Sequence, residues 1–186
     1  MKLSNKQQEF LDLARSGANV FLTGKAGTGK SFILREAIAM FNQQRKKVVA
    51  LAPTGVAATN INGQTIHSMF SINPFGIAAY EDCNFLRKEK RRLLESIDVI
   101  IIDEISMLRP DVLDAMNWTL IKNGCSPLKS KQVIFCGDLK QLPPPLDDNS
   151  RSILLRTYDG EDFTYAKVYE QLEVKEIELD EVLRQS

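Results

Sequence analysis

One stretch constrains the fold of this chain more than any other: Gly24-Lys25-Ala26-Gly27-Thr28-Gly29-Lys30-Ser31. It matches the phosphate-loop pattern G-x-x-x-x-G-K-[ST] at every fixed position. An apolar run typical of a β-strand, residues 19–23, precedes it, and a helical run, residues 31–42, follows it. A tight turn alone would need neither Lys30 nor Ser31. The stretch therefore predicts a nucleoside triphosphate site.

Each part of the loop has an expected task. Gly24, Gly27 and Gly29 let the backbone turn and aim its N–H groups at an anion, and the dipole of the following helix points to the same place. Lys30 is expected to reach the β- and γ-phosphates, and the Ser31 hydroxyl to bind Mg²⁺.

Length and composition limit the other possibilities. The 186 residues suffice for one domain with a core, and 24 basic residues balance 24 acidic ones, so any nucleic-acid affinity must be local. The chain has three cysteines, without C-x-x-C spacing, and a single histidine, so it lacks the ligand set of a zinc site. We expect the cysteines to be reduced, buried thiols. Without an apolar run of membrane-spanning length, we expect a soluble intracellular protein with no membrane partner.

Short apolar runs alternate with helical patterns, which indicates an α/β fold with a mostly parallel sheet covered on both faces. We expect strands near residues 19–23, 48–52, 98–103, 131–138 and 175–179, and helices near 6–15, 31–44, 56–60, 85–96, 110–122, 152–157 and 165–171. Residues 70–84 lack periodicity and are expected to be irregular. Phe70 and Phe75 are interpreted as core residues.

Ligands of such sheets lie beyond the carboxyl ends of the strands, so the residues found there are candidates. Asp103 could hold the metal through water and Glu104 could polarise the attacking water, although an acidic helix start would look the same. Gln141 could contact the γ-phosphate and the lytic water. Thr54 and Gly55 open a helix that suits a backbone phosphate of nucleic acid, or that is an ordinary small-residue helix start.

Several segments together resemble the Pif (petite integration frequency) family of DNA helicases and their RecD-type relatives in superfamily 1B. They are, in order, Leu3-Ser4 followed by Gln7, then GKAGTGKS, LAPTGVAA, TIHS, IIIDEISML, CGDLKQLPP and LDEVLRQ. These segments span almost the whole chain in the family's order. The resemblance implies a three-layer RecA-like P-loop NTPase domain, residues 1–186, with a small irregular insertion at about 70–96.

The resemblance also implies roles for particular residues. ATP would be bound by Gln7, reading the adenine, with Gln8 a weaker candidate, and by Gly24, Gly27, Thr28, Gly29, Lys30 and Ser31. Mg²⁺ would be held by Ser31 and Asp103. Catalysis would involve Lys30, Glu104, Gln141 and Arg184, and single-stranded DNA would contact Thr54, Gly55, Thr65 and His67.

A helicase of this class needs a second RecA-like domain, and we expect that domain to be missing from this chain. ATP-driven 5′ to 3′ translocation on single-stranded DNA would then belong to the full-length protein. The chain alone, expected to be monomeric, would hydrolyse ATP weakly or not at all. A nucleotide-gated interaction module without DNA coupling remains the alternative.

Overall fold

The structure, a computed structural model, describes residues 3–180. Six strands form one sheet in the order β3-β2-β4-β5-β1-β6, and every neighbouring pair is parallel. The strands are β1 (Val20–Gly24), β2 (Val48–Ala52), β3 (Gln64–Thr65), β4 (Val99–Ile102), β5 (Gln132–Gly137) and β6 (Lys175–Leu179). The parallel sheet expected from the apolar runs is confirmed.

Seven α-helices are described. They are α1 (Asn5–Arg15), α2 (Lys30–Gln43), α3 (Gly55–Asn60), α4 (Ile66–Phe70), α5 (Lys88–Glu95), α6 (Pro110–Lys122) and α7 (Asp148–Leu155). Local signals set several of their starts. Ser4 and Gln7 form a capping box at the start of α1, and Pro110 occupies the first turn of α6, where its missing N–H costs nothing.

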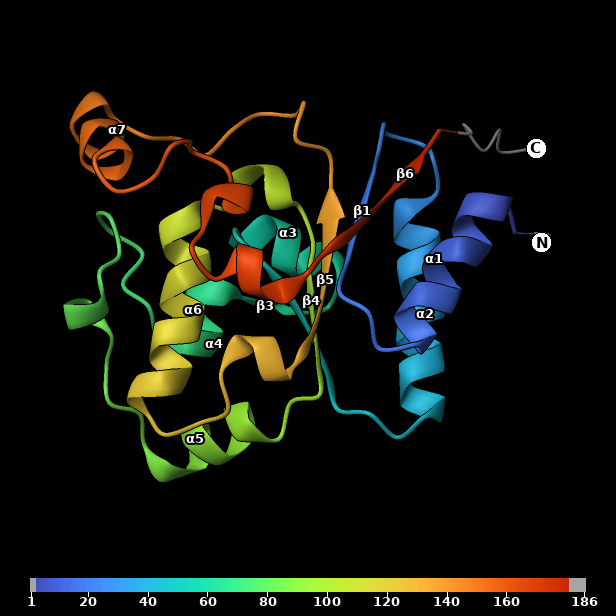
Figure 1. Ribbon diagram of the computed structural model, residues 1–186, viewed down its shortest axis with the longest axis horizontal. Helices are drawn as coiled ribbons and strands as arrows, with labels where there is room; N and C mark the ends of the chain where they lie inside the picture. Colours follow the sequence, from blue (N-terminus) through green and yellow to red (C-terminus); the bar gives the residue numbers. More distant parts are fainter. Residues whose placement is uncertain (1–2, 181–186) are drawn as a thin grey trace.

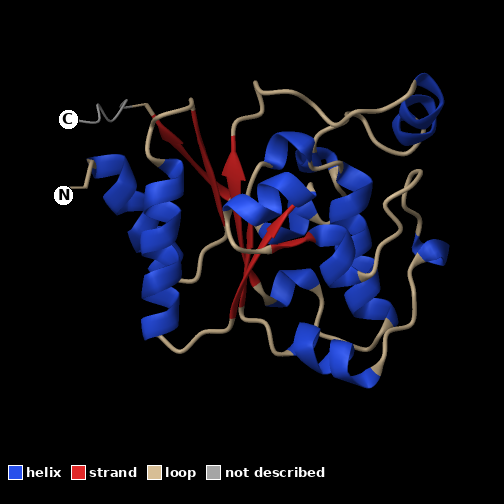
Figure 2. Cartoon of the chain, turned by 180° about the vertical axis from the view of Figure 1, so that it is seen from behind, coloured by secondary structure: helices blue, strands red, loops and turns tan. Residues whose placement is uncertain are grey.

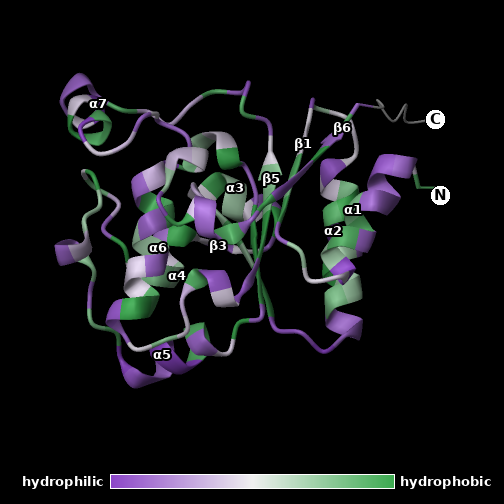
Figure 3. Ribbon diagram, viewed as in Figure 1, coloured by the Kyte–Doolittle hydropathy of each residue, from purple (hydrophilic) through white to green (hydrophobic). Residues whose placement is uncertain are grey.

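The molecule has three layers, as expected. Helices α1 and α2 lie on one side of the sheet, and α4, α5 and α6 lie on the other (Figures 1 and 2). Alternate side chains of a strand point to opposite faces of the sheet. Leu22 packs in the hydrophobic cluster beneath α1 and α2, whereas Phe21 packs in the cluster that includes α6. This double burial explains why β1, β4 and β5 read as apolar runs, and Figure 3 shows green in the middle of the sheet, whereas the edge strand β6 has exposed charged residues and is purple.

The α-helix expected over residues 165–171 is wrong. Two short 3₁₀ turns, Phe163–Tyr165 and Tyr169–Leu172, occupy this region. The backbone N–H groups of Lys167 and Val168 donate to the buried Asp114 carboxylate of α6 at 3.1 and 2.8 Å. An α-helix would need these donors for its own ladder, so the contact with α6 replaces the helix.

Other differences are smaller. Helix α7 begins at Asp148 because the Asp147 carboxylate caps it, accepting from the Ser150 N–H at 2.7 Å. Strand β3, which was not expected, pairs only with Leu51 and Ala52, and the first three residues of β2 are therefore half-buried.

The region from 71 to 87 contains no α-helix or strand, only one 3₁₀ turn at Tyr80–Asp82. Residues 71–84 are thus irregular as expected, whereas the helix expected from residue 85 begins at Lys88. Phe70 is fully buried as expected, but the core assignment of Phe75 is wrong, because 84% of that residue is exposed.

Candidate nucleotide-binding site

The carboxyl ends of β1, β2, β4 and β5 lie at one edge of the sheet. The register pairs Thr23 with Gly137 and Ile102 with both Leu51 and Phe135. The segments that follow these strands, which carry most of the candidate residues, therefore leave the sheet at the same edge. Figure 1 shows this edge at the top of the molecule, where the start of α2 also lies.

The phosphate loop has the backbone geometry that its glycines predict. Gly24 has φ 148°, and a Cβ there would come within 2.5 Å of the Leu179 carbonyl oxygen and 2.9 Å of Thr28 Oγ1. Gly29 has φ 86° and forms the left-handed N-cap of α2. Both positions suit glycine, because an L side chain rarely adopts these angles.

Lys30 lies back across the loop that precedes it. Its Nζ donates to the carbonyl oxygens of Gly24 at 2.6 Å and of Lys25 at 3.0 Å. The buried Thr28 hydroxyl also donates to the Lys25 carbonyl, at 2.8 Å. These bonds draw the two ends of the loop together and keep a positive charge beside the N-terminus of α2.

Two acidic residues follow β4 with different surroundings. Asp103 is half-buried and its Oδ1 accepts a hydrogen bond from the Glu104 N–H at 2.9 Å, whereas Glu104 is exposed. The Glu104 backbone is left-handed, with φ 55° and ψ 47°. A non-glycine residue held there is strained, and such strain is concentrated at functional sites.

A buried thiol, Cys136, lies at the same edge of the sheet, because its strand β5 pairs with β1. Burial raises the pKa of Cys136 on β5 well above its usual value, and the neighbouring Asp103 carboxylate raises it further. The charge of Glu104 acts in the same direction and that of Lys30 in the opposite one. Lys30, which follows β1, and Asp103 and Glu104, which follow β4, are thus within electrostatic reach of one thiol on β5.

The segment after β5 forms a tight turn over residues 138–141. The Gln141 N–H donates to the Asp138 carbonyl at 3.0 Å, and the Lys140 N–H donates to Asp138 Oδ1 at 3.0 Å. Gln141 is exposed at the site edge. Because β5 lies between β1 and β4, the turn leaves the sheet between the phosphate loop and the acidic pair.

The donors at this edge suit a magnesium nucleotide. The Ser31 hydroxyl is exposed at the first turn of α2, and the Asp103 carboxylate is only partly buried, so both can offer hard oxygen ligands. Within residues 3–180 no three His, Cys, Asp or Glu side chains form a metal cluster. Such a site fits Mg²⁺, which is bound through one or two protein oxygens together with substrate phosphates.

The four residues expected to contact DNA lie at two helix starts and on one short helix. Thr54 caps α3, accepting from the Ala57 N–H at 3.3 Å, and Gly55 begins that helix in the open. Thr65 caps α4, accepting from the Ser68 N–H at 3.1 Å. Since Thr54 follows β2 and Thr65 ends β3, these caps lie at neighbouring strand ends.

His67 lies on α4 and is half-buried. Burial lowers its pKa, the Arg109 charge lowers it further, and the Asp111 carboxylate opposes them. His67 is therefore kept neutral near pH 7 and can donate or accept a hydrogen bond.

The two candidate glutamines differ in burial. Gln7 is 2% exposed, and its Oε1 accepts from the Ser4 N–H at 3.0 Å in the capping box of α1. Gln8 is exposed, and its Nε2 donates to Asp12 Oδ1 at 2.9 Å. The start of α1 lies at the same end of its layer as the start of α2 (Figure 1). Arg184 lies outside the described residues.

Comparison with known proteins decides the family. Residues 2–186 match the family described as PIF1-like helicase. The chain belongs to this family. It is 40% identical over 158 residues to the ATP-dependent DNA helicase PIF1 of Saccharomyces cerevisiae, covering 80% of the chain and 18% of the yeast protein. It is 43% identical over 144 residues to Pif1 of Psychrobacter, covering 75% and 22%.

Solved structures of Pif1 helicases have the same fold as this chain. Bacteroides Pif1 bound to ssDNA superposes with a TM-score of 0.88 at 38% identity, over 100% of this chain and 43% of that one. Bacteroides Pif1 in complex with ADP-AlF4 gives a TM-score of 0.89 at 37% identity, over 100% and 44%. The chain thus spans less than half of these Pif1 structures and about a fifth of the two curated relatives. Its fold is the RecA-like P-loop arrangement.

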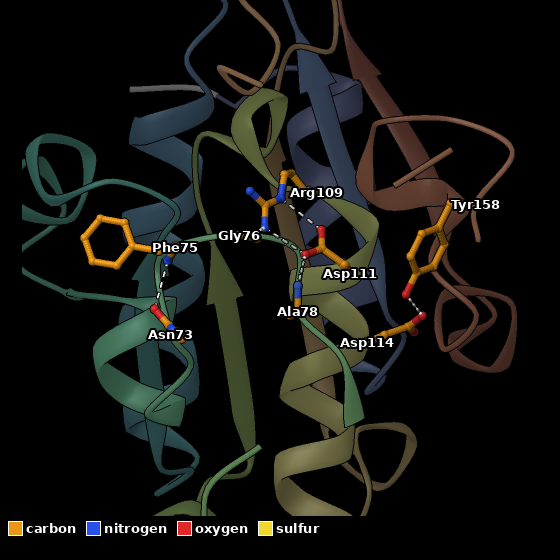
Figure 4. A network of polar contacts seen from close by, with 8 residues as sticks. All are labelled: Asn73, Phe75, Gly76, Ala78, Arg109, Asp111, Asp114 and Tyr158. Carbon is orange, nitrogen blue, oxygen red and sulfur yellow. Dashed lines mark hydrogen bonds and ion pairs between the residues drawn. The ribbon is translucent and has the colours of Figure 1, made fainter. Parts of the chain in front are cut away.

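Sequence patterns missed one part of this PIF1-family domain, a polar network beside His67. Arg109 and Asp111 bind each other and the irregular segment at Gly76 and Ala78 (Figure 4). No short motif identifies them, because their partners lie 33 residues away in the sequence.

Proposed function

We propose that this chain is the first motor domain of an ATP-dependent DNA helicase. It would bind Mg-ATP at the sheet edge and, within a full-length protein, couple hydrolysis to movement along single-stranded DNA. The observation that supports this most is that the phosphate loop after β1 and the acidic pair after β4 lie on either side of β5, in a chain of the PIF1-like helicase family.

Each residue would then have a defined task. The loop N–H groups and Lys30 would bind the β- and γ-phosphates, and Gln7 would contact the base. Ser31 and Asp103 would hold Mg²⁺, which supplies charge neutralisation at the phosphates when bound. Glu104 would accept a proton from the attacking water, Gln141 would orient that water, and Arg184 would bind the γ-phosphate.

The DNA strand would run across the two helix caps. The N–H groups at the starts of α3 and α4 can bind backbone phosphates, with Thr54, Gly55, Thr65 and His67 as contacts. The Bacteroides relative that aligns with the whole of this chain was solved bound to ssDNA. Movement would run from 5′ to 3′, a direction that rests on the family resemblance alone.

The remaining proposals concern the whole protein. The chain would fold as a single motor domain, with residues 70–96 as an insertion, and a second RecA-like domain would complete the ATP site. Alone it would be monomeric and would hydrolyse ATP slowly or not at all.

No helix of residues 3–180 is long and apolar enough to span a bilayer. We propose an intracellular location, which would be cytoplasmic in a bacterium and nuclear or mitochondrial in a eukaryote.

The test is steady-state ATP hydrolysis with and without oligo-dT, on this chain and on the reading frame extended beyond Ser186. We expect DNA to stimulate the extended form and Glu104→Gln to abolish turnover while nucleotide binding is retained. If both forms bind ATP but neither responds to DNA, the DNA coupling is wrong, and a nucleotide-gated interaction module describes the protein better. Strong unwinding by this chain alone would contradict the need for a second domain.

A further inference from the structure

The irregular segment after α4 presents an aromatic ring to solvent. Phe75 is 84% exposed, although its backbone is held in place: its N–H donates to Asn73 Oδ1 at 3.0 Å, and Gly76 follows with φ 76°. Figure 4 shows the Phe75 ring directed away from the polar network beside it. Singly exposed apolar side chains are common on protein surfaces, so what distinguishes Phe75 is the network that holds its turn.

A buried ion pair fixes this turn. Arg109 Nε and Nη2 donate to Asp111 Oδ1 and Oδ2 at 2.9 and 2.7 Å, with side-chain exposures of 15% for Arg109 and 0% for Asp111. Arg109 Nη2 also donates to the Gly76 carbonyl at 2.8 Å, and Asp111 Oδ2 accepts from the Ala78 N–H at 2.7 Å. The planar guanidinium thus holds one side of the turn, and its own partner holds the other side.

The same ion pair lies at the start of α6, a helix that packs against α4. Arg109 is five residues beyond Glu104 in the chain and Asp111 is seven, and the Ile105–Met107 turn lies between Glu104 and the pair. Its charges also act on His67 of α4, the helix that runs directly into the irregular segment. The Ile72 N–H donates to the His67 carbonyl at 3.0 Å, so Phe75 lies three residues beyond a backbone contact with α4.

We propose that Phe75 is a stacking platform for a base of single-stranded DNA, and that Arg109 and Asp111 are the positioning residues that hold it. The inference rests on the proposed function, which brings the strand to α4. Bases stack on aromatic side chains without regard to sequence, so the platform would add affinity and no sequence preference.

The first test is binding of fluorescein-labelled oligo-dT, measured by fluorescence anisotropy. Phe75→Ala is expected to weaken binding about tenfold, the usual scale for the loss of one base–aromatic stack. Phe85→Ala is the matched control, because Phe85 is also strongly exposed, at 80%, but is not held by the ion pair. Phe75→Trp should keep the affinity, and oligo-dT should quench its added fluorescence.

The second test separates positioning from mere stability. Arg109→Lys keeps the charge but loses the bidentate fork, and we expect several-fold weaker binding of oligo-dT. If Arg109 acts only through Phe75, the double variant should bind oligo-dT no more weakly than Phe75→Ala alone. Asp111→Asn provides a second variant of similar shape should Arg109→Lys fold poorly, and the melting curve of each variant checks its fold.

Three results would overturn the inference. One is a Phe75→Ala variant that binds oligo-dT as tightly as the unmodified chain does. Another is strictly additive effects of Arg109→Lys and Phe75→Ala, which would show that the pair does not act through the ring. If the unmodified chain binds ATP but no oligo-dT, both this inference and the DNA-binding part of the proposed function fail.

Discussion

The Tyr158 hydroxyl donates a 2.8 Å hydrogen bond to the Asp114 carboxylate in the interior of the protein. Asp114 is 1% exposed on α6, and Tyr158, 4% exposed, follows α7 (Figure 4). Burial raises the pKa of Tyr158, and the hydrogen bond to Asp114 raises it further, so the phenol stays protonated as a donor. The same carboxylate accepts the N–H groups of Lys167 and Val168, so one side chain anchors the chain from α7 to β6.

Removing this anchor should cost stability. Tyr158→Phe is expected to lower the free energy of unfolding by about 2 kcal/mol, because it deletes a bond to a buried acceptor. Asp114→Ala should cost more, because it also leaves two backbone donors without their partner. Urea denaturation measures both, with Tyr165→Phe as the control on a tyrosine that is 46% exposed. Equal midpoints for Tyr158→Phe and the control would contradict the prediction.

Substitution of Gly24 should damage the phosphate loop itself. In Gly24→Ala the added Cβ would meet the Leu179 carbonyl oxygen at 2.5 Å, so β6 or the loop must shift. We expect loss of binding of a fluorescent ATP analogue, measured by titration. Gly17→Ala is the control, because Gly17 also has a positive φ, 89°, but nothing lies within 4 Å of its Cβ position. If both variants bind nucleotide equally well, the close contact at Gly24 does not shape the site.

Glu104 should show a conflict between stability and activity. Glu104→Gly and Glu104→Gln are both expected to stop ATP hydrolysis, but only glycine relieves the left-handed backbone at φ 55°. The relief is worth up to about 1 kcal/mol, so Glu104→Gly should melt above Glu104→Gln in thermal denaturation. Equal melting temperatures for the two variants would show that the position is not strained.

His67 should make stability depend on pH. Its pKa is lowered in the folded state, mainly by burial, so the unfolded chain binds the proton more readily. The contribution to stability is present above the unfolded pKa of about 6.5 and is lost as the pH falls through the lowered folded pKa. Urea midpoints should therefore fall more from pH 7.5 to pH 5 in the unmodified chain than in His67→Gln. A parallel fall in both would argue against the burial effect.

Much of this domain could be predicted from the sequence because the signals are local. The phosphate loop, the apolar strands and the capping box at Ser4 are each set by a few adjacent residues. A strand that reads as a continuous apolar run must be buried on both faces, and this requirement leads to a parallel three-layer fold. The sequence therefore determined the fold class and the strand ends from which the site is built, whereas the roles of the individual site residues remain predictions.

Only the tertiary structure decided where the remaining side chains go. The contacts of Asp111 with Ala78 and of Asp114 with Tyr158 join residues 33 and 44 positions apart, and no periodicity encodes such pairs. Asp114 also accepts from the Lys167 and Val168 N–H groups, and two 3₁₀ turns form there in place of the helix expected at 165–171. The contact of Asp111 with Ala78 holds the segment that keeps Phe75 outside the core. The physical reason is that a buried carboxylate must find donors wherever the packed chain supplies them, and local propensity gives way to that requirement.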